Sequence, residues 1–191
     1  MSKQFFDHIN QYAAVSTVEF EEIMRFFELR TVRKKEMIME ANSPCTHTHF
    51  VLQGCLNMFF PTEKGVERTI QFGIENWWLT DFLSFGNRSS SNYAIQAVEK
   101  TTFLSISRDQ YDILLERFPQ MEKYFRVIYQ IGYGASLNKM RYLQDYSKED
   151  IYFHFTEQFP DFAQRVPQYL IASFLGLTPE YVSEIRAKRR S

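Results

Sequence analysis

One stretch near the C-terminus, QYLIASFLGLTPEYVSEIRAK (168–188), constrains the fold more than any other part of this sequence. It predicts two short helices joined by a tight corner. Gly176 stands where the first helix needs a left-handed residue to end. Thr178 is a suitable N-cap for the second helix. Pro179 then fits the first position of that helix, where a missing N–H costs nothing.

The apolar residues of this stretch have the spacing that two crossing helices require. Ile171 and Ala172 lie on one face of the first helix, and the small Ala172 lets the second helix approach closely. Val182 and Ile185, three positions apart, turn inward from the second helix. The pattern therefore predicts a helix-turn-helix, a unit whose second helix can enter the major groove of DNA.

Positive charge gathers at the same end of the chain. From residue 161 onward, five basic residues stand against three acidic ones, although the whole chain has a net charge of −1. Cations neutralise phosphates, while Ser, Tyr and Glu side chains can contact the backbone or the bases. The alternative is a solvated helical hairpin with a frayed basic tail. The residues that we predict to bind DNA are Gln168, Thr178, Pro179, Glu180, Tyr181, Ser183, Glu184, Arg186, Lys188, Arg189 and Arg190.

Composition limits the remaining possibilities. A hydrophobic content of 45% and an aromatic content of 17% supply a packed core. The near-zero net charge argues against a protein that coats nucleic acid or membranes over its whole surface. No apolar run approaches the length of a membrane span, and the polar N-terminus lacks the pattern of a secretion signal. Two cysteines are too few for a disulfide framework, so we expect a cytoplasmic protein without a membrane partner.

The chain divides into three regions. Two helices are expected first, at 3–12 and, after an N-cap at Ser16, up to about residue 29. Residues 31–107 then contain short β-favouring runs separated by turn residues, which indicate a sandwich or barrel. Helical patterns return after residue 108, and a helix capped by Ser147 ends before Pro160. We predict an α+β chain with a β-roll sensor domain (1–115), a dimerisation helix (116–146) and a helix-turn-helix domain (147–191).

The long helix that begins at Pro119 has two apolar stripes. A helix that is apolar on two sides must be covered on two sides. The stripe predicted to face the β-domain consists of Tyr129, Tyr133, Met140 and Leu143. The other stripe approximates a heptad, and we predict it to form a dimer seam; the alternative is a core helix of a monomer. The predicted seam consists of Met121, Phe125, Ile128, Gly132, Ala135, Lys139 and Tyr142.

The whole pattern resembles the Crp/Fnr family of bacterial transcription regulators. The motifs that carry the resemblance are FVLQG, WWLTDFLSF and the helix-turn-helix. The turn ENWW and the segment RVPQYLIASFLGLTPEYVSEIR are most similar to the branch common in Bacteroidetes. The resemblance implies a jelly-roll (double-stranded β-helix) domain like those that bind cyclic nucleotides. It also implies a homodimer on double-stranded DNA, with paired recognition helices in successive major grooves, and RNA polymerase as a further partner. Because the sequence stops at Ser191, we expect no full β-wing after the recognition helix, and phosphate contacts from the basic tail instead.

The chain departs from the family pattern at the effector site. Where cyclic-nucleotide-binding members have a Gly-Glu pair, this chain has Thr80 and Asp81, and the position of the phosphate-binding Arg is Ser91. Arg88 is the nearest substitute. Without that charge, cyclic AMP is not expected to bind in the usual way, so no cofactor is assigned and any small-molecule effector is of unknown identity. Trp77 and Trp78 either line a pocket or fill the end of the roll. The predicted effector pocket consists of Trp78, Thr80, Asp81, Arg88, Ser91, Asn92 and Tyr93.

A second class of function starts from CTHTH, in which Cys45, His47 and His49 alternate along a strand. Such residues can hold a metal in a cupin-like roll, but they would need a further ligand from a distant strand. The sequence has no phosphate loop, nucleophile elbow or other catalytic signature, so we expect neither enzyme activity nor a metal site. The alternative function is a metal- or small-molecule-binding roll whose C-terminal helices contact proteins.

Overall fold

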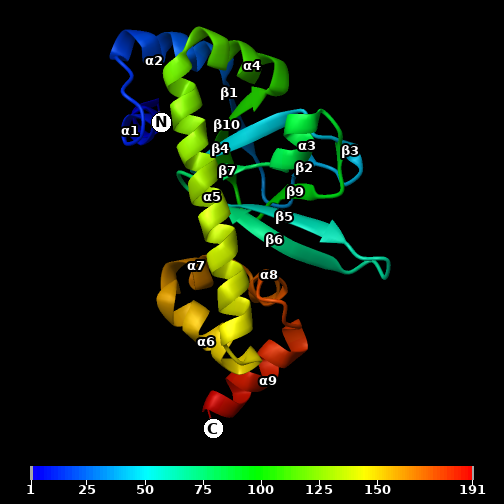
Figure 1. Cartoon of the computed structure of the whole chain (residues 1–191). Helices are drawn as coiled ribbons and strands as arrows, with labels where there is room; N and C mark the ends of the chain where they lie inside the picture. The colour runs from blue at the N-terminus through cyan, green and yellow to red at the C-terminus, as the bar shows by residue number, and fades with distance from the viewer. Residues whose placement is uncertain (1, 191) are drawn as a thin grey trace.

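The structure is a computed structural model that describes the backbone of residues 2–190 and the side chains of residues 3–189. It has a β-roll, a long helix along one side of the roll, and a bundle of short helices at the far end of that helix (Figure 1). The predicted α+β class and jelly-roll are confirmed. No helix in the described part of the chain combines the length and the apolar character needed to cross a membrane.

Ten strands build the roll. One sheet has the order β1-β10-β4-β7, a second has the order β2-β9-β5-β6, and β3 pairs with β8 alone. Every pairing is antiparallel. The strands are β1 (Glu28–Val32), β2 (Met37–Met39), β3 (Ser43–Pro44), β4 (His47–Gln53), β5 (Leu56–Pro61), β6 (Glu67–Gly73), β7 (Trp78–Leu79), β8 (Ser90–Ser91), β9 (Ala94–Ala97) and β10 (Thr101–Ser107).

Nine α-helices and one 3-10 turn surround or follow the roll in residues 2–190. Past β10, the described chain contains helices only. These elements are α1 (Ser2–Asn10), α2 (Thr17–Ile23), the 3-10 turn η1 (Met24–Phe26), α3 (Phe82–Asn87), α4 (Arg108–Arg117), α5 (Pro119–Asp145), α6 (Lys148–Gln158), α7 (Pro160–Arg165), α8 (Gln168–Phe174) and α9 (Pro179–Arg190).

Capping signals place the helix ends as the sequence predicts. The Ser16 hydroxyl accepts from the Glu19 N–H and the Glu19 carboxylate accepts from the Ser16 N–H, which forms a capping box. Ser147 caps α6 by accepting from the Asp150 N–H. The helix predicted to reach residue 29 is shorter, because residues 28–32 pair with β10 instead. This tertiary pairing outweighs local helix propensity.

Two groups of buried apolar residues hold the chain together. The larger lies in the roll and includes Phe50 and Phe103 from the sheets with Phe125 from α5. The smaller joins α6, α8 and α9, and it also includes Cys55 and Val98 of the roll. Helices α6–α9, called the head below, therefore share a hydrophobic cluster with the roll. The predicted division at residues 115 and 146 stays a prediction.

Candidate nucleic-acid interface

The corner between α8 and α9 has the predicted backbone geometry. Gly176 has φ +73°, the left-handed conformation that glycine adopts without strain. The Leu177 N–H donates to the Ala172 carbonyl (2.8 Å), which closes the end of α8. The Thr178 hydroxyl then accepts from the Tyr181 N–H (3.2 Å) and caps α9. Glycine, N-cap and proline thus act in the order that the sequence predicts.

The inner sides of α8 and α9 are packed as a helix-turn-helix requires. Ile171 and Ala172 are completely buried, and Val182 and Ile185 are 1% exposed. The predicted inward residues are confirmed. Because these residues hold α9 by one side only, its other side faces away from the roll, at the free end of the molecule (Figure 1).

The exposed side of α9 and its N-cap carries five of the predicted DNA-binding residues: Thr178, Pro179, Glu180, Ser183 and Glu184. The Ser183 hydroxyl donates to the Pro179 carbonyl one turn earlier (3.0 Å). This surface presents hydroxyls and carboxylates to the outside of the molecule. Two more predicted residues are half-buried and have partners in the head: the Gln168 amide donates to the Tyr152 hydroxyl (3.2 Å), and Tyr181 packs against the smaller cluster.

The cations of α9 are partly engaged within the head. Lys188 pairs with Glu184 (2.7 Å), a bond that raises the pKa of the lysine. Arg189 pairs with Glu157 of α6 (2.8 Å), and its guanidinium lies 4.3 Å from the centre of the Phe153 ring. Arg186 is half-buried, and the side chain of Arg190 lies outside the described residues. Exposed ion pairs contribute little, so a DNA phosphate can compete for these cations.

The predicted dimer seam of α5 is wrong in its orientation, because most of its residues face their own chain. Met121 is completely buried and Phe125 is 2% exposed in the roll core, against which Ile128 also packs. The Lys139 ammonium donates to the Ile70 carbonyl of β6 (2.8 Å), and the Tyr142 hydroxyl donates to the Ile151 carbonyl (3.0 Å). For Gly132 and Ala135 the dimer role stays a prediction.

The other stripe of α5 is the exposed one. Tyr133, Leu137 and Met140 are 68%, 47% and 58% exposed, so the expectation that Tyr133 and Met140 face the roll is also wrong. Of the same predicted stripe, Tyr129 bonds Tyr111 of α4 (2.8 Å) and Leu143 packs against the smaller cluster. Exposed residues at alternating spacings of four and three form a heptad line, called the outer seam below. The outer seam consists of Arg126, Gln130, Tyr133, Leu137, Met140 and Gln144.

Two local features accompany the outer seam. Arg126, Gln130 and Tyr133 border an open groove of about 790 Å³ between α4 and α5. A Cβ added at Gly132 or Gly134 would meet no atom of the chain within 4 Å. These glycines, each costing about 1 kcal/mol in a helix interior, are therefore not required by packing inside the chain.

Only part of the predicted effector pocket comes together. The Asp81 carboxylate caps α3 and accepts from the hydroxyls of Ser84 (2.6 Å) and Ser91 (2.8 Å). Although burial opposes it, this bonding lowers the pKa of Asp81. The Thr80 hydroxyl donates to the His47 carbonyl (2.8 Å), and the Ser91 hydroxyl accepts from the Tyr93 N–H (3.0 Å). Ser91, at the position predicted for the phosphate-binding Arg, thus carries no charge and donates to the carboxylate of Asp81.

The other three predicted pocket residues form none of the hydrogen bonds described at Asp81 and Ser91. Arg88 pairs with Asp109 (2.5 Å) and Asp112 (2.9 Å) of α4. Trp78 is buried and donates from its indole to the Tyr124 hydroxyl of α5 (2.8 Å), so it fills the core instead of lining a pocket. Asn92 is exposed.

The CTHTH residues do not converge on one point. The Cys45 thiol is buried against the Thr80 hydroxyl (3.2 Å), and His49 is buried against the Ser105 hydroxyl (3.1 Å). Burial, together with the nearby His47, lowers the pKa of His49 to about 3. Among the described residues, no group of three or more His, Cys, Asp or Glu side chains is placed to hold a metal ion.

Solved structures that are similar to this chain share its arrangement of a β-roll, a long helix and a C-terminal group of helices. Residues 29–118 match the family model of the cyclic nucleotide-binding domain. FixK2 from Bradyrhizobium japonicum is similar in structure, with a TM-score of 0.69, 17% identity, and 85% of this chain and 83% of that chain covered. For the c-di-GMP responsive global regulator CLP of Xanthomonas campestris, the TM-score is 0.67, the identity 13% and the coverage 89% of each chain. The Thermus thermophilus catabolite activator protein has a TM-score of 0.57 and 15% identity over 95% of this chain and 85% of its own.

These findings confirm the resemblance stated from the sequence. The chain has a cyclic nucleotide-binding domain within the fold of the Crp/Fnr regulators. No curated protein sequence gives a match. The Bacteroidetes branch stays a prediction.

Proposed function

We propose that this protein is a DNA-binding transcription regulator that acts as a homodimer. The observation that carries the proposal is the α8–α9 corner, whose Gly176 turn and buried Ala172 leave one side of α9 exposed at the end of the molecule. A short helix supported from one side is the form that enters a major groove. Since bacterial DNA lies in the cytoplasm, this proposal includes the predicted cytoplasmic location. RNA polymerase is a further partner, and no catalytic step is assigned.

Dimerisation through the outer seam supports this function. Tyr133, Leu137 and Met140 give the seam an apolar centre, and the spacing suits a second copy of α5 packed alongside. The open space beside Gly132 and Gly134 allows two helix backbones to approach closely there. A two-fold pair through this seam would present two heads, as a near-palindromic site requires.

Cyclic AMP is not proposed as the effector. The position of the phosphate-binding Arg is Ser91, whose hydroxyl donates to Asp81, while Arg88 is held by two carboxylates of α4. A phosphate site without a cation is weak. An effector of other chemistry would act by binding one dimer arrangement more tightly than the other.

The test of the proposed function is selection of duplexes from a randomised DNA pool, followed by anisotropy titrations of the selected duplex at two salt concentrations. We expect enrichment of a two-fold-related sequence and a binding constant that falls with salt. Arg186→Ala should weaken binding, whereas Arg117→Met, which removes a cation paired with Glu22 far from the head, should not. Failure of the pool to enrich any sequence would refute the proposal.

A further inference from the structure

The head is attached to the roll along an open sheet edge. Strand β6 lies at the edge of its sheet, so its outward backbone groups need partners from outside the sheet. The Thr69 N–H donates to the Ser173 hydroxyl of α8 (2.9 Å), and that hydroxyl donates to the Glu67 carbonyl (3.3 Å). Lys139 of α5 donates to the Ile70 carbonyl, further along the same strand (2.8 Å). The head and the long helix thus supply hydrogen-bond partners to backbone groups of β6.

Apolar contacts cover the same junction. The Phe72 ring of β6 lies 5.1 Å from the Phe162 ring and 5.2 Å from the Phe174 ring of the head, measured between centroids. The Lys139 ammonium lies 3.6 Å from the centre of the Phe174 ring, a cation–π distance. One side chain of the long helix therefore contacts both the roll and the head.

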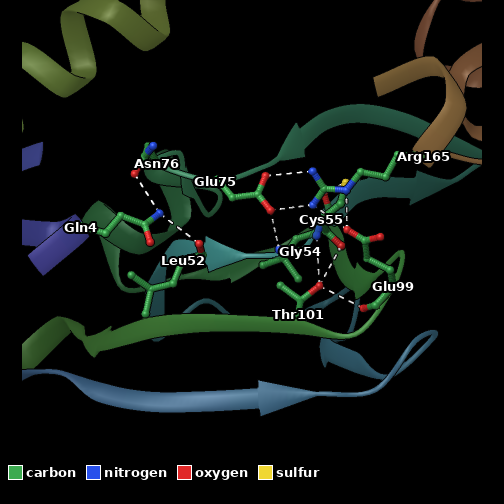
Figure 2. Close-up of polar contacts among 10 residues, drawn as sticks. Gln4, Leu52, Gly54, Cys55, Glu75, Asn76, Glu99, Thr101 and Arg165 are labelled. Carbon is green, nitrogen blue, oxygen red and sulfur yellow. Dashed lines mark hydrogen bonds and ion pairs between the residues drawn. The ribbon is translucent and has the colours of Figure 1, made fainter. Parts of the chain in front are cut away.

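Arg165, the last residue of α7, holds this junction from the other side (Figure 2). Its guanidinium donates to both carboxylate oxygens of Glu75 (2.9 and 2.7 Å) and to Glu99 (2.6 Å). Glu75 follows β6 and Glu99 follows β9, so the arginine joins two turns of the roll. A guanidinium suits this geometry because its planar fork can bond two carboxylates at once.

The turn that carries Glu75 has further hydrogen bonds within the roll. Besides binding Arg165, the Glu75 carboxylate accepts from the Gly54 N–H (2.7 Å). Gly54 has φ +108°, and a Cβ there would lie 2.5–2.7 Å from atoms of Thr101, so this turn has room for glycine alone. On the other side, the Gln4 amide donates to the Asn76 side chain (3.0 Å), as Figure 2 shows.

We propose that Arg165 is a positioning residue for DNA recognition, which it serves by fixing the head on the roll. The inference rests on the proposed function. Only two residues separate Arg165 from the start of α8, so its contacts with Glu75 and Glu99 set the direction in which the helix-turn-helix leaves the roll. Two heads on a two-fold site must match a half-site spacing of about 34 Å. Heads that are free to rotate would have to be ordered on binding, which weakens affinity.

The test uses the full chain and two measurements. The first is hydrogen exchange of the Thr69 amide, which donates to the head and so reports docking without DNA. The second is affinity for a duplex that the wild-type protein has selected from a randomised pool. Arg165→Glu places three carboxylates together, and adding Glu99→Arg restores one cation between two carboxylates. Arg165→Lys is a milder variant in case Arg165→Glu does not fold, and Arg117→Met is the matched control for loss of an exposed paired arginine.

We expect Arg165→Glu to speed Thr69 exchange and to weaken DNA binding, each by about tenfold or more, as loss of charge-assisted hydrogen bonds implies. Arg165→Lys should give smaller changes of the same sign. The double variant should return both measurements toward the wild type, which a general loss of folding would not do. Unchanged Thr69 exchange in Arg165→Glu would overturn the inference, and so would faster exchange with unchanged affinity. Normal exchange behaviour in a wild-type protein that selects no DNA would refute the proposed function instead.

Discussion

Buried His49 gives the most quantitative prediction, and it bears on the metal-binding alternative. The imidazole is 3% exposed in β4, and Nδ1 bonds the Ser105 hydroxyl of β10 (3.1 Å). Burial holds its pKa at about 3, far below the ordinary value of 6.5. The residue is therefore neutral in the folded roll at any pH near neutrality. The buried His49 side chain fills the core of the roll, and we do not assign it to a ligand site.

The pH dependence follows from proton linkage. As pH falls below 6.5, the unfolded chain binds a proton at His49 and the folded chain does not, so stability falls and continues to fall until pH reaches about 3. Between pH 7.5 and pH 5.0, protonation of His49 in the unfolded chain should lower the free energy of unfolding by about 2 kcal/mol. This free energy depends almost entirely on the pKa of His49 in the unfolded chain, because His49 in the folded chain stays unprotonated over this pH range.

Urea unfolding at the two pH values measures this cost. His49→Asn keeps a side-chain partner for Ser105 but cannot titrate, so its loss of stability from pH 7.5 to pH 5.0 should be about 2 kcal/mol smaller than that of the wild type. Thr48→Val in the same strand is the control. It removes a buried hydroxyl without a partner, so it should raise stability by about 1 kcal/mol at both pH values. Equal pH dependence of the wild type and His49→Asn would refute the reasoning.

Three further predictions test the seam, the corner and the α3 cap. Leu137→Arg should turn the proposed dimer into a monomer at micromolar concentration in sedimentation experiments, because the exposed halves of two leucines contribute about 1.5–3 kcal/mol on burial and a buried charge costs more; an unchanged dimer would contradict the outer seam. Gly176→Ala should lower the unfolding free energy by about 1 kcal/mol through left-handed strain alone, since the site is open; no loss in urea melts would count against the corner geometry. Asp81→Asn should destabilise the chain by about 1–2 kcal/mol at pH 7, since a carboxylate accepting several bonds is replaced. The difference from the wild type should shrink as pH falls and the Asp81 carboxyl, whose pKa is lowered, takes up its proton; a gap that does not change with pH would contradict this.

Local signals made the head predictable. The order of Gly176, Thr178 and Pro179 specifies one corner through backbone geometry, and neighbouring residues are enough to recognise it. The cap at Ser147 was predictable for the same reason. The class of the roll followed from the frequency of turn residues, although the short helix α3 was not predicted.

Features that depend on distant partners were not predictable. Both stripes of α5 are apolar, and the sequence does not state which one the roll covers; Met121 and Tyr133 were therefore assigned to the wrong sides. A count of charges likewise gives no information on pairing, so the contact of Arg189 with Glu157 was not expected. The predicted seam and the outer seam both keep alternating spacings of four and three, so periodicity alone does not distinguish them.

In the proposed dimer, two copies of α9 read one DNA duplex together. Hydroxyl-radical footprinting of the wild-type protein on its selected duplex measures this. Two protected patches are expected, related by two-fold symmetry and separated by about one helical turn, 10–10.5 base pairs. A single protected patch, or protection that does not depend on the exposed side of α9 when Ser183→Asp is compared with the wild type, would contradict this proposal.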